Sequence, residues 1–238
     1  MKYKGIHVKA LKSLLLIVGF FIATQAKAGF ITINETQLDA IFSQPSFGSR
    51  PIDIRIGAAT ELVLPNLLDI TTNNEVNNLF SMHVGLFNVV NFYFIDTISA
   101  CGSTIHPGIV GCGQTPGNNF VVESGYASGS NGSELLAHEL AHNLGLHHNS
   151  GNTLMDPYIN GFTTLTEQEA NSIHSSSLVQ DNGLDYWINI NPVLVVASAS
   201  IPLPVPEPST LMLFLLSFGF IFKNAINSIN RNKRIKLK

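Results

Sequence analysis

Residues 138–148 read HELAHNLGLHH and hold four of the eight histidines in this chain of 238 residues. On an α-helix, side chains four residues apart point in nearly the same direction, so a helix here would bring His138 and His142 to one side. His148 can join them only if the chain turns sharply after the second histidine. Gly145 tolerates the backbone angles of such a turn. The stretch therefore predicts a helix that ends near Gly145 and a bend that brings three imidazoles together.

Three converging imidazoles predict a metal site. Neutral imidazole binds zinc well, and a catalytic zinc ion typically has three protein ligands and a water. Glu139 follows the first histidine, where its carboxylate could take a proton from that water and pass it to a leaving group. We therefore expect one catalytic Zn²⁺ with His138, His142 and His148 as ligands and Glu139 as the general base. The alternative is a histidine-rich surface helix that binds no metal.

The other face of this helix predicts how it is anchored. Leu136, Leu140 and Leu144 recur every four residues and would face the core, while Ala137 and Ala141 would allow close packing. One stretch would thus hold the site and fix it to the fold. The remaining histidines of the central region are expected to be structural or exposed: His83, His106, His147 and His174.

The pattern H-E-x-x-H-x-x-G-x-x-H over residues 138–148 resembles that of the metzincin metalloproteases. A second mark of that family is a turn with a methionine beneath the zinc, and residues 152–157 (NTLMDP) are similar to it. The resemblance implies that Met155 supports the metal site without binding the ion. In some metzincins a tyrosine two positions after the methionine is a further ligand, but here Pro157 has that place and Tyr158 follows. We therefore expect no tyrosine ligand.

The same resemblance implies an α+β fold. Its parts would be a twisted mixed sheet with an antiparallel edge strand, two long helices behind the sheet, and the zinc in a cleft. Residues 118–123 (NNFVVE) are expected to be the edge strand, along which an extended peptide would form main-chain hydrogen bonds.

The residue pattern itself predicts several elements. Residues 51–56 (PIDIRI) alternate apolar and polar side chains, as a strand does, and residues 89–95 (VVNFYFI) are apolar on both faces, as an interior strand would be. Thr166 and Glu169 have the spacing of a capping box and predict the start of a last helix. Residues 187–204 are expected to add a terminal strand followed by a linker.

The N-terminal region has the order of a secretory signal peptide. Four lysines precede the apolar run at 14–23 (LLLIVGFFIA), and small residues follow it, so that cleavage after Ala28 is expected. The apolar run is about half of the roughly 20 residues that a membrane-spanning helix needs. We therefore expect residues 1–28 to be a signal peptide, with a membrane anchor or a core helix as the alternative.

The C-terminal region predicts a sorting signal. A Pro-rich linker at 201–208 precedes a tail at 209–238, in which a basic end follows twelve apolar residues, a marginal length for spanning a membrane. Pro206-Glu207-Pro208 followed by these features resembles the PEP-CTERM sorting signal of Gram-negative bacteria. That resemblance implies an exosortase-type processing enzyme as a partner and export to the cell surface. The alternative is an ordinary tail anchor.

The charge distribution argues against one class of partner. Between Gly29 and Pro208 the chain has two basic residues, Arg50 and Arg55, and all sixteen acidic residues, a net charge of −14 with histidine neutral. Binding to nucleic acid or anionic lipid needs clustered lysine or arginine. We therefore expect no nucleic-acid partner, and membrane contact only through the C-terminal tail.

The chain has two cysteines, Cys101 and Cys112, in a stretch rich in glycine. Export would place them in an oxidising compartment, where a pair that closes a short loop is expected to form a disulfide. The alternative is metal ligation, but thiols eleven residues apart lack the C-x-x-C spacing of common zinc sites.

Residues 29–200 are thus expected to form the catalytic domain of an exported zinc endopeptidase that acts on extended peptide or protein substrates. Its location would be the cell surface, outer membrane or extracellular matrix of a Gram-negative bacterium. Two alternatives remain: a metal-binding surface or matrix protein with the same fold and no hydrolysis, and a zinc hydrolase of non-peptide substrates. The first gives Glu139 no role, because a structural zinc usually has four protein ligands and needs no base.

Overall fold

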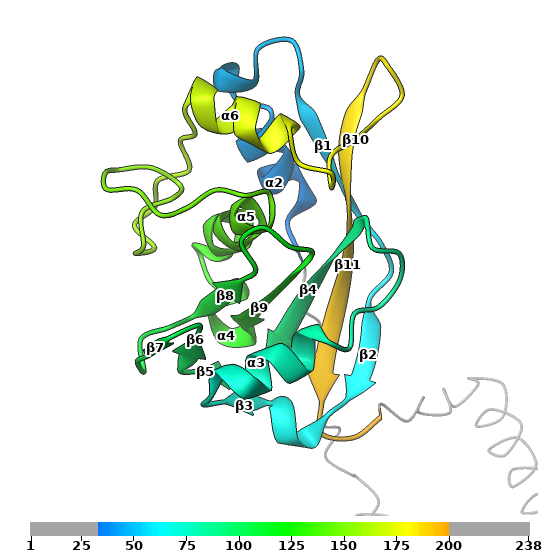
Figure 1. The fold of residues 1–238 in the computed structure, drawn as a ribbon, viewed down its shortest axis with the longest axis vertical. Helices are drawn as coiled ribbons and strands as arrows, with labels where there is room; N and C mark the ends of the chain where they lie inside the picture. Colours follow the sequence, from blue (N-terminus) through cyan, green and yellow to red (C-terminus); the bar gives the residue numbers. More distant parts are fainter. Residues whose placement is uncertain (1–32, 200–238) are drawn as a thin grey trace, which may run out of the picture. The chain divides into compact units, whose positions relative to one another are not determined.

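The computed structural model of this chain describes residues 33–199 (Figure 1). The predicted signal peptide (1–28), the Pro-rich linker (201–208) and the sorting tail (209–238) lie outside the described residues. Within residues 33–199, no helix has both the length and the apolar character needed to cross a membrane.

A mixed sheet of seven strands lies at the centre of the described fold. Five strands follow one another in the order β1 (Ile52–Ile56), β11 (Tyr186–Val196), β4 (Val89–Ile95), β9 (Asn119–Glu123) and β8 (Gly111–Gly113), while β2 (Thr60–Val63) and β10 (Gln180–Asp181) also pair with β11. The strands β1, β2 and β4 run parallel to β11, and β9 runs parallel to β4. Only β8 and β10 are antiparallel to their neighbours in this sheet. The predicted α+β fold with a mixed sheet is therefore confirmed.

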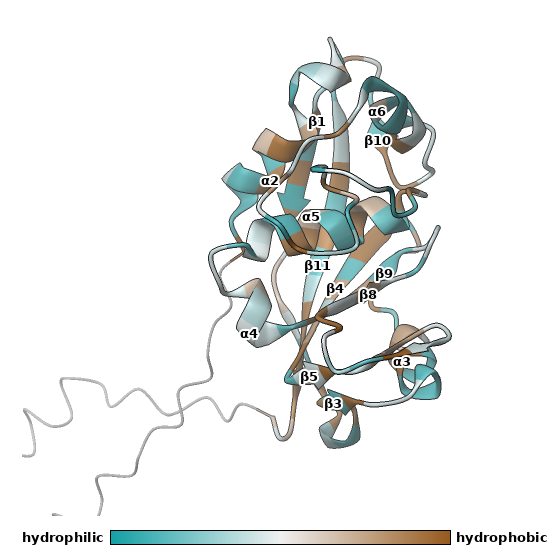
Figure 2. Cartoon of the chain, turned by 90° about the vertical axis from the view of Figure 1, so that its left-hand side faces the viewer, coloured by the Kyte–Doolittle hydropathy of each residue, from teal (hydrophilic) through white to brown (hydrophobic). Residues whose placement is uncertain are grey.

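Helices cover both faces of the sheet, and β4 separates two apolar clusters. Val90, Phe92 and Phe94 pack in one cluster with residues of α2 (Glu35–Phe42) and α5 (Gly132–Asn143). Tyr93 and Ile95 pack in the other cluster with residues of α3 (Asn73–Phe80). Figure 2 shows α2 and α5 lying across one face of the sheet. Burial on both faces explains why residues 89–95 are apolar throughout, as predicted.

The remaining elements are short. They are the helices α4 (Ser124–Ala127) and α6 (Glu167–His174), the 3-10 helices at Pro45–Phe47 and Pro65–Leu67, and the two-stranded sheets β3 (Asp69–Ile70) with β5 (Thr97–Ile98) and β6 (Ala100–Cys101) with β7 (Thr104–Ile105). At the start of α6, Thr166 and Glu169 form the predicted capping box. The expectation of two long helices behind the sheet was wrong, because α2 has 8 residues and α5 has 12.

The edge strand was predicted at the wrong place. Residues 119–123 form β9, which lies between β4 and β8, whereas β8 is the antiparallel strand at this edge of the sheet. The physical reason is burial: Phe120 and Val122 enter one apolar cluster and Val121 enters the other, as is typical of an interior strand. The true edge strand reads Gly-Cys-Gly and has no apolar alternation that would predict a strand.

The C-terminal strand is central rather than peripheral. β11 lies between β1 and β4 and is the longest strand of the described residues, with 11 residues. It contains Pro192, which an interior strand rarely has because proline cannot donate a ladder hydrogen bond. The carbonyl of Ile190 accepts from Gly57, so even-numbered residues of β11 direct their backbone groups toward β1 and β2. Pro192 thus faces the break between those two strands, where no ladder partner needs its N–H.

Candidate metal centre

Helix α5 is buried on almost every side. It contacts α2 and α4 as well as the strands β4, β8 and β9. Leu136 and Leu140 are at most 1 % exposed, and Ala137 and Ala141 are fully buried, so the predicted anchoring face is confirmed. Because α5 is fixed on several sides, the side chains of His138, Glu139 and His142 start from a rigid backbone.

The predicted bend follows the end of the helix. The N–H of Gly145 donates to the carbonyl of His142 (2.9 Å), and the N–H of Leu146 donates to the carbonyl of Ala141 (3.0 Å). These two bonds make a Schellman motif, which needs a left-handed residue after the helix. Gly145 supplies it with a φ of 97°. The chain then reverses toward the helix and brings His148 back to it.

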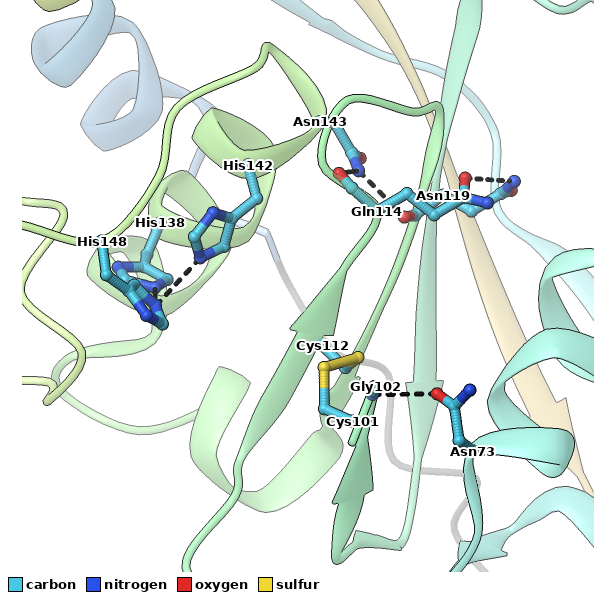
Figure 3. Close-up of a disulfide and its surroundings, with 10 residues drawn as sticks. All are labelled: Asn73, Cys101, Gly102, Cys112, Gln114, Asn119, His138, His142, Asn143 and His148. Carbon is cyan, nitrogen blue, oxygen red and sulfur yellow. Dashed lines mark hydrogen bonds between the residues drawn. A yellow bond between two sulfur atoms is a disulfide. The ribbon is translucent and has the colours of Figure 1, made fainter. Parts of the chain in front are cut away.

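The structure brings the three predicted histidines together. Nε2 of His148 lies 3.2 Å from Nε2 of His138 and 3.1 Å from Nε2 of His142. Figure 3 shows the three rings pointing toward one another. His138 and His142 are 4 % and 9 % exposed, whereas His148 is exposed to solvent. The three side chains are therefore close enough to hold one metal ion, on the solvent side of a buried helix.

In His138 and His142, a hydrogen bond at Nδ1 determines which ring nitrogen carries the hydrogen and which has a free lone pair. Nδ1 of His138 lies 2.6 Å from the carbonyl oxygen of Leu154, and Nδ1 of His142 lies 2.8 Å from that of Leu146. A carbonyl oxygen can only accept, so each Nδ1 carries the hydrogen and the neutral ring presents a lone pair at Nε2. This tautomer is the one that a metal ion requires.

Burial keeps these imidazoles in the neutral form. It lowers the pKa of His138 below its ordinary value and brings the pKa of His142 to about 4, although the carbonyls at the two Nδ1 atoms act in the opposite direction. Burial also lowers the pKa of His148, while nearby Asp156 works against that shift. At neutral pH the three nitrogens are therefore lone-pair donors.

The methionine-bearing turn is bonded to both ends of the histidine motif. The carbonyl of Leu154 accepts from His138, and the carbonyl of Met155 accepts from the backbone N–H of Asn149, directly after the third histidine, over 3.0 Å. Met155 itself is completely buried. The turn thus holds the first and third histidines in a common frame.

Glu139 points away from solvent, toward the edge strand. It is 5 % exposed, and its carboxylate lies against Gly111 and Gly113 of β8. Its Oε2 atom has no hydrogen-bond partner within residues 33–199. Burial raises the pKa of the Glu139 carboxyl to about 8. A buried carboxyl without an internal partner is poised to exchange a proton, and a nearby cation would favour its charged form.

The other predicted residues are not part of this cluster. Cys101 and Cys112 form the predicted disulfide, with their Cα atoms 5.6 Å apart. His147 is exposed, and Tyr158 is 78 % exposed. His83 bonds to Asn119 and to the carbonyl of Leu86, as a structural histidine does.

Two buried polar residues of α5 were missed from the sequence. Glu134 accepts hydrogen bonds from the backbone N–H groups of Asn160 and Gly161, and so fastens the loop that follows the methionine turn. Asn143 donates to the carbonyls of Gln114 and Asn119, each over 2.9 Å, and ties the end of the helix to the β8–β9 hairpin. A polar residue on a helix normally indicates a solvated face, so no local signal marks either one.

The arrangement can bind one metal ion through three neutral imidazoles, with a buried carboxyl on the same helix. No protein-family model matches the chain, and neither a curated protein nor a solved structure matches it. The function is therefore argued from the chemistry of these side chains.

Proposed function

We propose that this chain is an exported zinc-dependent endopeptidase of the metzincin type. His138, His142 and His148 are its metal ligands and Glu139 is its general base. The observation that carries the proposal is the convergence of three Nε2 atoms, two of them on rings whose Nδ1 atoms donate to backbone carbonyls. Rings held in this way present lone pairs to one point, which serves a cation and has no benefit for packing.

Two of the three spacings between the nitrogens fit zinc. Ligand nitrogens around a tetrahedral zinc ion with bonds of about 2.0–2.1 Å are about 3.3 Å apart. The separations of 3.1 and 3.2 Å from His148 to the other two histidines agree with this value, and all three ligand atoms lie within 4.8 Å of one another. Three protein ligands leave a fourth position for water or substrate, as in catalytic rather than structural zinc sites. A zinc ion bound there would polarise a carbonyl group and make water a stronger acid.

Glu139 fits the role of base for three reasons. It adjoins the first histidine on the same helix, its carboxylate is buried, and its Oε2 is free of internal hydrogen bonds. In the proposed reaction Glu139 accepts a proton from the attacking water and passes it to the amide nitrogen of the leaving group. A structural metal site would need no such group.

The open edge of β8 supports an extended peptide as substrate. Glu123 donates to the carbonyl of Val110 and Gln114 donates to the carbonyl of Asn119. Hydrogen-bonded pairs alternate in an antiparallel ladder, so the N–H and C=O groups of Gly111 and Gly113 point away from β9. No strand within residues 33–199 pairs with that edge. A peptide added there would lie beside the strand that contacts Glu139.

The disulfide supports export. Cys101 and Cys112 are bonded, as expected for a protein of an oxidising compartment, and no free cysteine exists. We propose the Gram-negative cell surface, outer membrane or extracellular matrix as its location, with an exosortase-type enzyme acting on the tail and membrane contact through that tail alone. The acidic domain gives no support to nucleic-acid binding.

The proposal is tested with the purified full chain. Zinc content is measured by elemental analysis, and casein hydrolysis is followed before and after treatment with a chelator. We expect about one zinc per chain, loss of hydrolysis on chelation and recovery when zinc is restored. Glu139→Gln should retain zinc and lose hydrolysis by a factor of 10² or more, as expected on loss of a general base.

Different outcomes separate the alternatives. Zinc binding without hydrolysis of casein or of mixed peptide libraries would contradict the endopeptidase and favour a metal-binding structural protein. Hydrolysis of ester or amide model substrates with no cleavage of peptides would favour a zinc hydrolase of another substrate class. His147→Ala is the matched control for the ligands, since His147 is exposed and adjoins His148.

A further inference from the structure

The edge strand β8 lies beside helix α5 (Figure 1) and presents two glycines to it. A methyl group on Gly111 would lie 2.8 Å from Cδ and 3.0 Å from Cγ of Glu139. Carbon atoms in contact are normally about 3.5–4.0 Å apart. A methyl group on Gly113 would lie 3.0 Å from Oε2 of Glu139 and 3.1 Å from Cβ of His142. The Glu139 carboxylate therefore occupies space that side chains at positions 111 and 113 would otherwise fill.

Neither side of this contact can easily withdraw. Glu139 extends from α5, whose neighbouring residues Ala137 and Ala141 are fully buried against the core. On the other side, Cys112 points to the opposite face of β8, where it is 4 % exposed and bonded to Cys101. Figure 3 shows this disulfide next to β8. A side chain at position 111 would thus clash with Glu139, and this clash would be relieved by movement of the Glu139 carboxylate rather than of the helix or the strand.

We infer that Gly111 and Gly113 are positioning residues for Glu139. Because neither residue has a side chain, the Glu139 carboxylate can lie against β8, and the disulfide holds this strand in place. Neither glycine has a side chain that could contact the reacting groups. This inference rests on the proposed function for its effect on catalysis, but the contact with Glu139 stands independently of any activity.

The first test compares Gly111→Ala with wild type in the full chain. Displacing a catalytic group by about 1 Å can cost about 100-fold in rate, so kcat should fall by about this factor. KM should change little, because the backbone groups of Gly111 at the open edge are kept. Zinc content should also be unchanged. A Gly111→Ala protein with wild-type kcat would overturn the inference.

Gly125→Ala is the matched control. Gly125 is exposed on α4, and a methyl group there meets no atom within 4 Å. It should leave kcat, KM and zinc content at wild-type values. An equal loss of kcat in both variants would show that the effect is not specific to Glu139, and would also overturn the inference.

A second test needs neither metal nor activity. The stability of the metal-free chain is measured in urea for wild type, Gly111→Ala, Glu139→Ala and the double variant. Residues in contact show coupling that corresponds to about a tenfold change in the unfolding equilibrium constant. Gly111→Ala should favour unfolding by about this factor when Glu139 is present and have no such effect in Glu139→Ala.

The two tests separate this inference from the proposed function. If Gly111→Ala changes the stability equally with Glu139 present and in Glu139→Ala, the inferred contact is overturned, even if the chain is an active peptidase. A clear coupling in a chain that hydrolyses no peptide would support the positioning of Glu139 and contradict only the proposed reaction. Should Gly111→Ala fail to fold while the double variant folds, the coupling is shown directly, since removal of Glu139 then relieves the clash.

Discussion

Nδ1 of His138 donates a hydrogen bond of 2.6 Å to the carbonyl oxygen of Leu154, the residue before the buried Met155. This bond joins the first proposed ligand to the turn that the sequence indicated at residues 152–157. It selects the tautomer whose Nε2 is free, and it fixes the orientation of the ring before a metal arrives. Two of the three proposed ligands, His138 and His142, are thus oriented by backbone carbonyls.

Replacement of each proposed ligand by alanine should abolish tight zinc binding. Loss of a group that merely orients a ligand costs about 10- to 100-fold in metal affinity, so loss of a ligand itself should cost more than 100-fold. Zinc affinity is measured by competition with a chromophoric chelator for His138→Ala, His142→Ala and His148→Ala. His147→Ala should bind zinc as wild type does; a loss equal to that of His148→Ala would contradict the choice of the third ligand.

Gly145→Ala should weaken both the fold and the metal site. The φ of 97° costs an alanine about 1–2 kcal/mol, and relief of this strain would move the bend that delivers His148. Urea unfolding of the metal-free chain and zinc affinity are the two measurements. Gly145→Asn should lose less stability, because asparagine tolerates left-handed angles better than alanine. Wild-type stability in Gly145→Ala would show that the bend is not strained.

The cluster of three histidines was predictable because its information is local. His138 and His142 are related by helical periodicity, and Gly145 marks the bend, so one short stretch specifies most of the geometry. The capping box of Thr166 and Glu169 is local in the same way. These features depend on backbone dihedrals and neighbouring residues, which a sequence shows directly.

The sheet was predicted less well because strand order depends on distant pairings. Residues 118–123 look like a short strand from the sequence, but their place between β4 and β8 follows from packing on both faces. Pro192 argues against an interior strand, and only the break between β1 and β2 makes it acceptable in β11. Gly111 and Gly113 resemble loop glycines until Glu139 is seen against them.

Met155 is expected to matter for stability more than for ligation. Met155→Leu nearly conserves volume and should cost less than about 1.5 kcal/mol, whereas Met155→Ala leaves a cavity and should cost about 2–5 kcal/mol. Both variants should keep about one zinc per chain, since the Leu154 carbonyl still orients His138. Stability is measured by urea unfolding and zinc by elemental analysis. Loss of zinc in Met155→Leu would indicate that the sulfur itself binds the ion.

Removal of the disulfide should destabilise the fold. Cys101 and Cys112 are separated by 11 residues, and closing a loop of this size contributes about 3 kcal/mol in the chain-entropy description. The double variant Cys101→Ser/Cys112→Ser should unfold at lower urea than wild type. A reducing agent should lower the wild-type midpoint toward that of the double variant and leave the double variant unchanged. An equal response of both proteins to the reducing agent would contradict this explanation.

His174 should make stability depend on pH. It lies in α6 between the rings of Phe47 and Tyr186, with centroids 5.8 and 4.9 Å away, and its Nε2 lies 2.8 Å from the carbonyl oxygen of Arg50. Burial lowers the pKa of His174, the Arg50 carbonyl raises it, and the charge of Arg50 lowers it again, so that the folded pKa lies below the ordinary value of 6.5.

The sign of this dependence follows from proton binding. Below pH 6.5 and down to the folded pKa of His174, the unfolded chain binds more protons at this residue than the folded chain, so stability falls as the pH decreases through that window. Above pH 6.5 the contribution is constant. The unfolding free energies of wild type and His174→Gln are compared with chelator present at pH 5.0, 6.0 and 7.5. Relative to the variant, wild type should therefore be less stable at low pH than at pH 7.5. The change should be small because the ring is partly exposed, and a difference that stays constant over this range would contradict the assignment.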